Sequence, residues 1–277
     1  MMKTVHSQLL CMLLIVILLL CISGLTIVMA QPSQMVEKST LTRVLKNNVL
    51  RVGILTNNPP WGYLDKNFNN VGFDIDIAKL MAEALGVKLQ LVETENVNRV
   101  PFLVTDKVDI IIAVFGNTLE RAKSISFSEA YAPYILVVVG HKDDVDFKSW
   151  TDLSGKKIAL GRGTTSDTIL SKIAPEGTEI VRYETPTDCF LALEQGKVDA
   201  VSDGYDTCAY YVNLHPEWEI KGEPFQRTFP CMGVQIGDQV WLNWVNLFIN
   251  HMLNEGKFQE LYQKHFQVPW TKIWPSY

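Results

Sequence analysis

The stretch VDIIIAVFGNTLERAKSISFSEAYAPY, residues 108–134, decides the predicted fold. Residues 108–114 form an almost entirely apolar run rich in β-branched side chains, which is typical of a parallel strand buried on both faces. Gly116 and Thr118 follow as loop and N-cap residue types, and Arg121 comes three residues later. Free backbone N–H groups and a guanidinium therefore meet at the carboxyl end of a strand, where open α/β sheets bind ligands.

Arg121 is the candidate anion-binding residue of this stretch. A guanidinium beside free N–H groups suits a carboxylate, because it can donate two parallel hydrogen bonds. The same spacing is compatible with a surface ion pair between Arg121 and either Glu120 or Glu129. The pattern alone leaves both interpretations open.

The first 30 residues differ from the rest of the chain. An apolar run begins at Leu9 and continues toward Ala30, and Val28-Met29-Ala30 fits the small-x-Ala pattern of a cleavage site. We therefore predict a secretory signal at residues 1–30 and a periplasmic or otherwise extracytoplasmic protein. The run is also long enough to span a membrane, so an uncleaved anchor is the alternative.

Composition excludes several classes of function. The formal net charge is −5 and no basic patch is present, which argues against binding to nucleic acid. Beyond the signal, the cysteines are Cys189, Cys208 and Cys231, an odd number without a C-x-x-C pair. We expect buried free thiols, although Cys189 could pair with Cys208 in an oxidising compartment. No spacing of histidines, acids or serines indicates a metal, a cofactor or a nucleophilic triad.

Short apolar runs alternate with amphipathic helical stripes, and the pattern restarts after the charged stretch at 141–146. This alternation predicts an α/β fold with two lobes, each built on a parallel sheet of βαβ units. Two crossings near Gly140 and Cys231 would form a hinge, and clefts between domains often bind ligands. The predicted divisions are a signal at 1–30, a leader at 31–44, lobe 1 at 45–138 plus 233–277, and lobe 2 at 139–232.

Blocks spread over the chain carry a family resemblance. They are GFDIDIA (72–78), VDIIIA (108–113), TLERAK (118–123), FSEAY (127–131), WTDLSGKKIA (150–159), GTTS (163–166) and GKVDAV (196–201). With these blocks in this order and at this spacing, the chain resembles the periplasmic polar amino-acid-binding proteins, which are family 3 of the extracellular solute-binding proteins. The resemblance covers essentially all of residues 45–270. The resemblance implies the two-lobe periplasmic-binding-protein fold, a monomer, a free amino acid between the lobes, and delivery to an ABC permease in the inner membrane.

The resemblance also implies a site for the α-carboxylate of the ligand. Arg121 would bind it, together with backbone N–H groups near Gly116 and Thr165 and a hydroxyl from Thr164 or Thr165. Thr118, in the same loop as Gly116, is counted with this set.

The contact with the ligand's α-ammonium departs from the family pattern. The family places an aspartate where this chain has Gly204. Asp203 is the first choice to replace it, and Asp206 is the reserve.

The ligand's side chain would meet the first loop and the Asn96–Arg99 turn. Trp61 could stack on the ligand or could pack the first loop. In some relatives that accept aspartate or glutamate, an arginine at the place of Arg99 reads the second carboxylate; the alternative is a solvated arginine that caps a short helix. The pair Arg99 and Arg121 favours an acidic or amide ligand such as glutamate, aspartate or glutamine.

Two other functions share this architecture. Periplasmic cyclohexadienyl or arogenate dehydratases need a general acid in the cleft, and their glutamate falls on Thr207 here, with Asp206 the nearest acid. A sensory module is the third interpretation, which would require docking onto a partner. We predict a binding protein rather than an enzyme.

Overall fold

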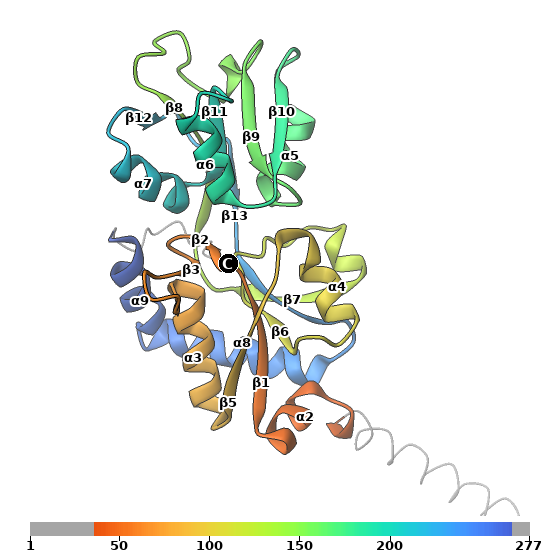
Figure 1. Cartoon of the computed structure of the whole chain (residues 1–277). Helices are drawn as coiled ribbons and strands as arrows, with labels where there is room; N and C mark the ends of the chain where they lie inside the picture. The colour runs from red at the N-terminus through yellow and green to blue at the C-terminus, as the bar shows by residue number, and fades with distance from the viewer. Residues whose placement is uncertain (1–35, 268–277) are drawn as a thin grey trace, which may run out of the picture.

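The computed structural model describes residues 36–267, which form two α/β lobes joined end to end (Figure 1). Each lobe has its own sheet with helices packed against it, so the predicted two-lobe α/β fold is confirmed. The sheets are mixed rather than parallel as predicted, because several strands in each of them pair antiparallel. The predicted signal at 1–30 lies outside the described residues. Among residues 36–267, no helix is both long and apolar enough to cross a membrane.

Lobe 1 combines the first half of the chain with its last strand and two helices (Figure 1). Its elements are α2 (Thr40–Asn47), β1 (Val49–Ile54), β2 (Asn57–Asn58), β3 (Gly62–Leu64), β4 (Asn70–Val71), α3 (Phe73–Leu85), β5 (Lys88–Glu93), the 3-10 turn η1 (Asn96–Asn98), α4 (Arg99–Val104), β6 (Ile110–Ile111), the 3-10 turn η2 (Arg121–Lys123), β7 (Ile125–Ala130), β14 (Cys231–Gln235), α8 (Gln239–Asn254) and α9 (Lys257–Phe266). The sheet order is β5-β1-β6-β14-β7, and a small sheet, β2-β3-β4, lies beside it.

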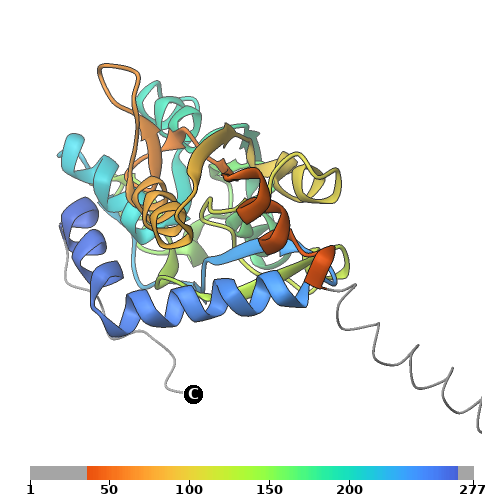
Figure 2. The same ribbon diagram turned by 90° about the horizontal axis from the view of Figure 1, so that it is seen from below.

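The apolar run at 108–114 contributes only the short strand β6, but β6 lies at the centre of the sheet. It pairs in parallel with β1 and antiparallel with β14, and residues 110–112 are fully buried. Helix α8 runs along one side of the lobe and α9 turns back from its end (Figure 2). The apolar stripe of α8 faces the core, where Trp241 and Val245 have no exposed surface. Burial of β6 on both faces of the sheet explains the unbroken apolar run at 108–114.

Lobe 2 is the insert between β7 and β14. Its elements are β8 (Tyr134–His141), the 3-10 turn η3 (Trp150–Asp152), β9 (Lys157–Gly161), α5 (Thr165–Ile173), β10 (Glu179–Tyr183), α6 (Pro186–Glu194), β11 (Ala200–Gly204), α7 (Tyr205–Leu214), β12 (Trp218–Ile220) and β13 (Gln226–Thr228). The sheet order is β10-β9-β11-β8-β12, with β13 also paired to β8. Cys189 and Cys208 are buried here as free thiols, as expected, and Cys231 is a buried free thiol at the start of β14.

The crossings between the lobes lie at residues 131–133 and 229–230, between β7 and β8 and between β13 and β14. The first is earlier than the predicted boundary at 138, because β8 pairs antiparallel with β11 in the sheet of lobe 2. An apolar run shows that a strand is buried but not which sheet it joins. Each crossing contains a proline, Pro133 in the first and Pro230 in the second. A hydrogen bond joins the two crossings, since the Tyr131 N–H donates to the Pro230 carbonyl at 3.0 Å.

Part of the predicted leader belongs to the fold. Helix α2 begins at Thr40, and its N-cap Ser39 accepts a hydrogen bond from the Leu41 N–H. Asp238, which caps α8, accepts hydrogen bonds from Ser39 Oγ at 3.0 Å and Thr40 N–H at 2.6 Å. The predicted boundary at residue 44 therefore cuts through a helix whose Val44 is buried in lobe 1.

Asp109→Ala is expected to lower the free energy of unfolding by about 3 kcal/mol, because it removes a buried carboxylate that pairs with two arginines. Asp109 accepts from Arg43 and Arg51 at 2.7 Å each, and only 2% of its side chain is exposed. Urea denaturation measures the effect.

Asp106→Ala is the matched control, since Asp106 contacts the same two arginines but 48% of its side chain is exposed. We expect it to cost less than about 1 kcal/mol. Equal losses in the two variants would contradict the assignment of a structural role to Asp109.

Candidate ligand-binding site

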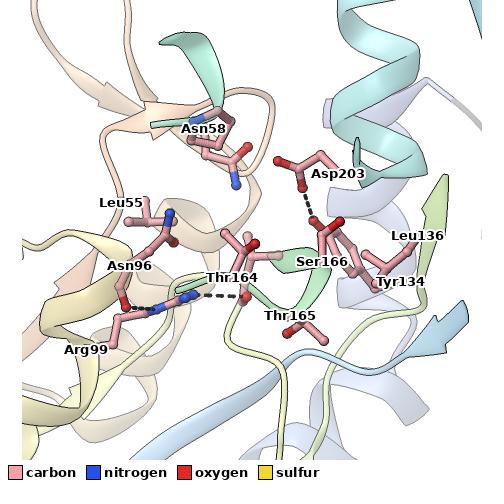
Figure 3. A pocket seen from close by; sticks show the side chains of 12 residues that line it. Leu55, Asn58, Asn96, Arg99, Tyr134, Leu136, Thr164, Thr165, Ser166 and Asp203 are labelled. Atoms are coloured by element: carbon pink, nitrogen blue, oxygen red, sulfur yellow. Dashed lines mark hydrogen bonds between the residues drawn. The ribbon is translucent and has the colours of Figure 1, made fainter. Parts of the chain in front are cut away.

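A cavity lies between the lobes, and side chains of both line it (Figure 3). The polar residues around it include Asn58, Asn96 and Arg99 of lobe 1, and Tyr134, Thr164, Thr165 and Asp203 of lobe 2. Direct contacts hold the lobes together around the cavity: Thr187 Oγ1 donates to the Asn57 carbonyl at 3.0 Å, and Thr207 Oγ1 donates to Asn58 Oδ1 at 3.1 Å. The structure therefore describes a closed arrangement.

Arg99 opens helix α4 and faces this cavity (Figure 3). Only 2% of it is exposed, so the alternative of a solvated arginine is excluded. Its guanidinium donates to the carbonyls of Asn96 at 3.0 Å, Ala113 at 2.9 Å and Val114 at 3.3 Å. Burial and then the charge of Arg121 lower the pKa of Arg99 to about 9.

Arg121 lies next to Arg99 but is not among the residues that line the cavity. It donates to the Gly116 carbonyl at 2.5 Å and, across the lobes, to the Gly163 carbonyl at 2.7 Å. The same Gly163 oxygen lies 3.4 Å from Arg99 Nη2. Burial lowers the pKa of Arg121 to about 10. Because Gly163 belongs to lobe 2, opening the lobes would remove this one acceptor from both guanidinium groups, while their hydrogen bonds to carbonyls of lobe 1 would remain.

Neither arginine has a carboxylate partner within ion-pair distance among residues 36–267. The surface pairs considered for Arg121 do not form, since Glu120 binds Lys123 and Glu129 binds Asn250. Both guanidinium groups instead lie over the ring of Phe115, with their central carbons 4.6 and 4.9 Å from its centroid. Cation–π contact offsets only part of the cost of removing the two charges from water, of which Arg99 is buried and Arg121 half-buried.

A buried carboxylate shapes the backbone under Arg99. Val114 has a φ of 46°, a strained value for a β-branched residue. Its N–H donates to Asp74 at 2.9 Å, and the hydroxyl of Tyr131 donates to the other oxygen of Asp74 at 2.8 Å. Burial raises the pKa of Asp74 to about 7, although both hydrogen bonds oppose the shift. Sequence reasoning used Asp74 only as part of the GFDIDIA block and did not find this role.

The loop before α5 brings backbone N–H groups to the cavity. Thr164 caps this helix by accepting from the Asp167 N–H at 3.1 Å, and Thr165 is its first residue. The positive end of a helix dipole favours an anion at this place. Gly116 of lobe 1 approaches Thr165 so closely that a Cβ on it would lie 2.2 Å from Thr165 Oγ1.

The two acids considered for the ligand's ammonium lie in different places. Asp203 lines the cavity and accepts a hydrogen bond from the Tyr134 hydroxyl at 2.6 Å. Asp206 does not line it, and instead accepts from the Tyr262 hydroxyl of lobe 1 at 2.7 Å. Burial raises the pKa of Asp206 to about 7. Asp206 thus links the lobes away from the cavity, and only Asp203 has the geometry of a ligand contact.

Three further predicted residues, Gly116, Trp61 and Thr118, do not line the cavity. Trp61 is fully buried in lobe 1, where its ring meets Phe73 and Tyr134 edge-on. Thr118 accepts a hydrogen bond from the Arg121 N–H at 3.2 Å, so its contact is with the turn that carries Arg121. The lining residues Asn58, Asn96 and Tyr134 were not among the predicted contacts. Asn58 lies on the first loop and Asn96 on the Asn96–Arg99 turn, which were both expected to meet the ligand. Tyr134 is the first residue of β8, where no sequence signal indicated a contact.

A family model described as bacterial extracellular solute-binding proteins, family 3, matches residues 50–268. This match spans most of the chain, and the chain belongs to that family. It is therefore an extracytoplasmic solute-binding protein, as the sequence blocks predicted.

Individual relatives agree on the class but differ in their named ligands. An ABC transporter glutamine-binding protein of Bacillus subtilis is 29% identical over 248 residues, which cover 87% of each chain. A glutamate/aspartate import solute-binding protein of Salmonella typhimurium is 29% identical over 252 residues, which cover 83% of this chain and 80% of that protein. A crystal structure of an ancestral amino acid-binding protein, a precursor of cyclohexadienyl dehydratase, has a TM-score of 0.77 at 34% identity and covers 82% of this chain and 100% of its own.

Gly116→Ala is expected to block closure, because the added Cβ would collide with Thr165 Oγ1. Ligand affinity should fall at least about tenfold while each lobe stays folded. Calorimetry measures the affinity, and small-angle X-ray scattering in the presence of ligand measures closure.

Gly116→Ala combined with Thr165→Ala removes the colliding oxygen and should recover compaction on ligand binding. A single Gly116→Ala variant that compacts as the parent does would show that the two residues do not limit closure.

Proposed function

We propose that this protein captures an acidic or amide amino acid, namely glutamate, aspartate or glutamine, between its lobes in the periplasm. As a monomer it would deliver this ligand to an ABC permease in the inner membrane. The observation that carries the proposal is the buried guanidinium of Arg99, which faces the cavity beside Arg121 without a carboxylate partner among the described residues.

The charge balance of the site supports an anionic ligand. A buried charge without a partner costs several kcal/mol, and a ligand carboxylate would offset that cost. The N-terminus of α5 supplies donors for one carboxylate, and Arg99 supplies them for a second carboxylate or an amide oxygen. Arg121 does not line the cavity but adds a second positive charge beside Arg99. Asp203 is the acceptor for the ammonium group. A zwitterion with an added acid or amide matches this set of groups.

The two-lobe arrangement supports capture followed by delivery. The lobes meet through hydrogen bonds that surround the cavity, so ligand binding and closure are coupled through the difference in affinity between the open and closed forms. A permease can then distinguish the closed surface from the open one. The names of the two curated relatives, which refer to an ABC transporter and to import, support this partner.

The residues at the dehydratase position do not favour catalysis. Thr207 stands where such an enzyme has its glutamate, and its hydroxyl donates to Asn58. The neighbouring acid, Asp206, is bonded to Tyr262 and does not line the cavity. Binding without chemistry is therefore the function that we propose.

Isothermal calorimetry on protein that has been unfolded and refolded to remove carried-over ligand tests the proposal. We expect tight binding of glutamate, aspartate or glutamine. Arg99→Ala should weaken this binding at least about 100-fold, because it removes the buried cation that meets the ligand side chain. Steady heat from turnover of arogenate would instead indicate an enzyme.

Arg162→Ala is the control for a nonspecific loss of positive charge. Arg162 precedes Gly163 in the same loop but is exposed and bonded to Glu184. We expect the Arg162→Ala variant to bind glutamate, aspartate or glutamine as tightly as the parent does. If Arg99→Ala also keeps the parent's affinity and its preference for acidic or amide ligands, the assignment of Arg99 fails.

A further inference from the structure

The place where the family pattern has its aspartate is already filled in this protein. Gly204 ends β11, and a Cβ added to it would lie 2.1 Å from Cε2 and Cζ of Tyr134 and 2.5 Å from its hydroxyl oxygen. No ordinary Cβ contact is so short. The phenol of Tyr134 therefore occupies the space that any side chain at position 204 would need.

We propose that Tyr134 is a specificity-determining residue that moves the acceptor for the ligand's ammonium from position 204 to Asp203. The proposal rests on the function proposed above, since it names the residue that prepares the amine end of the same site. It explains Gly204 and Tyr134 together: the glycine makes room for the phenol, and the phenol holds the acid beside it.

The hydrogen bonds around Asp203 fix one half of its carboxylate. Oδ1 accepts from the Tyr134 hydroxyl at 2.6 Å and from the Gly204 N–H at 2.7 Å. The other carboxylate oxygen points across the cavity toward Asn58 (Figure 3). Tyr134 thus occupies one oxygen and leaves the other directed at the space between the lobes, where a cationic group can approach it.

The ring of Tyr134 is held from both lobes. Tyr134 is the first residue of β8, directly after the crossing at 131–133, and Trp61 of lobe 1 meets its ring edge-on at 5.5 Å between centroids. This contact gives the buried Trp61 a role in the site, because it supports the residue that orients Asp203. Tyr134 is accordingly a positioning residue that acts through the carboxylate.

The same geometry makes amine binding depend on pH. Burial raises the pKa of Asp203, and the hydrogen bond from Tyr134 opposes that rise. The other titratable groups that interact with Asp203 are Arg99 on α4, Cys189 on α6, and Cys208 and Tyr211 on α7. An ammonium needs the ionised carboxylate, so affinity falls as the pH drops through the raised pKa. Removing the Tyr134 hydroxyl raises the pKa further and moves this loss of affinity to higher pH.

Tyr134→Phe keeps the ring and removes the hydroxyl, so it tests positioning without opening a cavity. Calorimetry with glutamate, and with glutarate as the counterpart without an amine, would be run from about pH 5 to about pH 8. We expect the affinity for glutamate to fall about tenfold and its pH profile to shift upward, while the affinity for glutarate is unchanged. Tyr183→Phe, a half-buried tyrosine of the same lobe, is the control and should change neither.

Three results would overturn the proposal. If Tyr134→Phe keeps the parent's affinity for glutamate and its pH profile, the hydroxyl has no role in binding. The proposed function would still stand in that case, because the parent binds glutamate. Equal affinity of the parent for glutarate and glutamate shows that no amine acceptor exists. A parent that binds neither compound overturns the proposed function and this inference together.

The filled position is tested separately by moving the acid back. Gly204→Asp alone should destabilise lobe 2 and abolish binding, because its side chain collides with Tyr134. Gly204→Asp combined with Tyr134→Ala removes the collision and should recover both the melting temperature and binding of glutamate. This strong non-additivity is the expected signature of two residues that compete for one space. A Gly204→Asp protein as stable and as active in binding as the parent would overturn the proposal.

Discussion

A buried guanidinium and a half-buried one, which meet at one carbonyl oxygen, are the constraint on which the rest of the site depends. Arg99 and Arg121 both reach the carbonyl of Gly163, from the opposite lobe, and share the ring of Phe115. Carbonyl oxygens and an aromatic face stabilise a cation, but they bring no negative charge. The closed form therefore carries an electrostatic cost that the carboxylate of the proposed ligand would offset, and closure would then depend on occupancy.

The backbone beneath these charges is arranged at a further cost. The strained conformation of Val114 persists because Asp74 and the surrounding core hold its N–H in place. In that conformation the carbonyls of Ala113 and Val114 both point at Arg99. The buried carboxylate of Asp74 and the unfavourable φ of Val114 thus hold the carbonyls that position the buried guanidinium of Arg99. Each of these three features explains the presence of the other two.

The sequence predicted the features that follow from periodicity and from local chemistry. The apolar run at 108–114 is buried as expected, and the alternation of apolar runs with helical stripes restarts in a second lobe as expected. The features that were missed depend on which elements meet. Asp206 is one turn from Asp203 in sequence, but it faces Tyr262 of the other lobe. The space around Gly204 is set by Tyr134, seventy positions earlier, and no local pattern encodes that contact.

The prolines of the two crossings restrict how the lobes can separate. Pro133 and Pro230 each fix one φ angle and lack an N–H, and the hydrogen bond between Tyr131 and Pro230 ties the crossings to one another. Rotation of one lobe against the other must then be absorbed by few remaining torsions. We expect a hinge of this kind to sample few orientations when open, so that little conformational entropy is lost on closure. More of the free energy of ligand contact is consequently expressed as affinity.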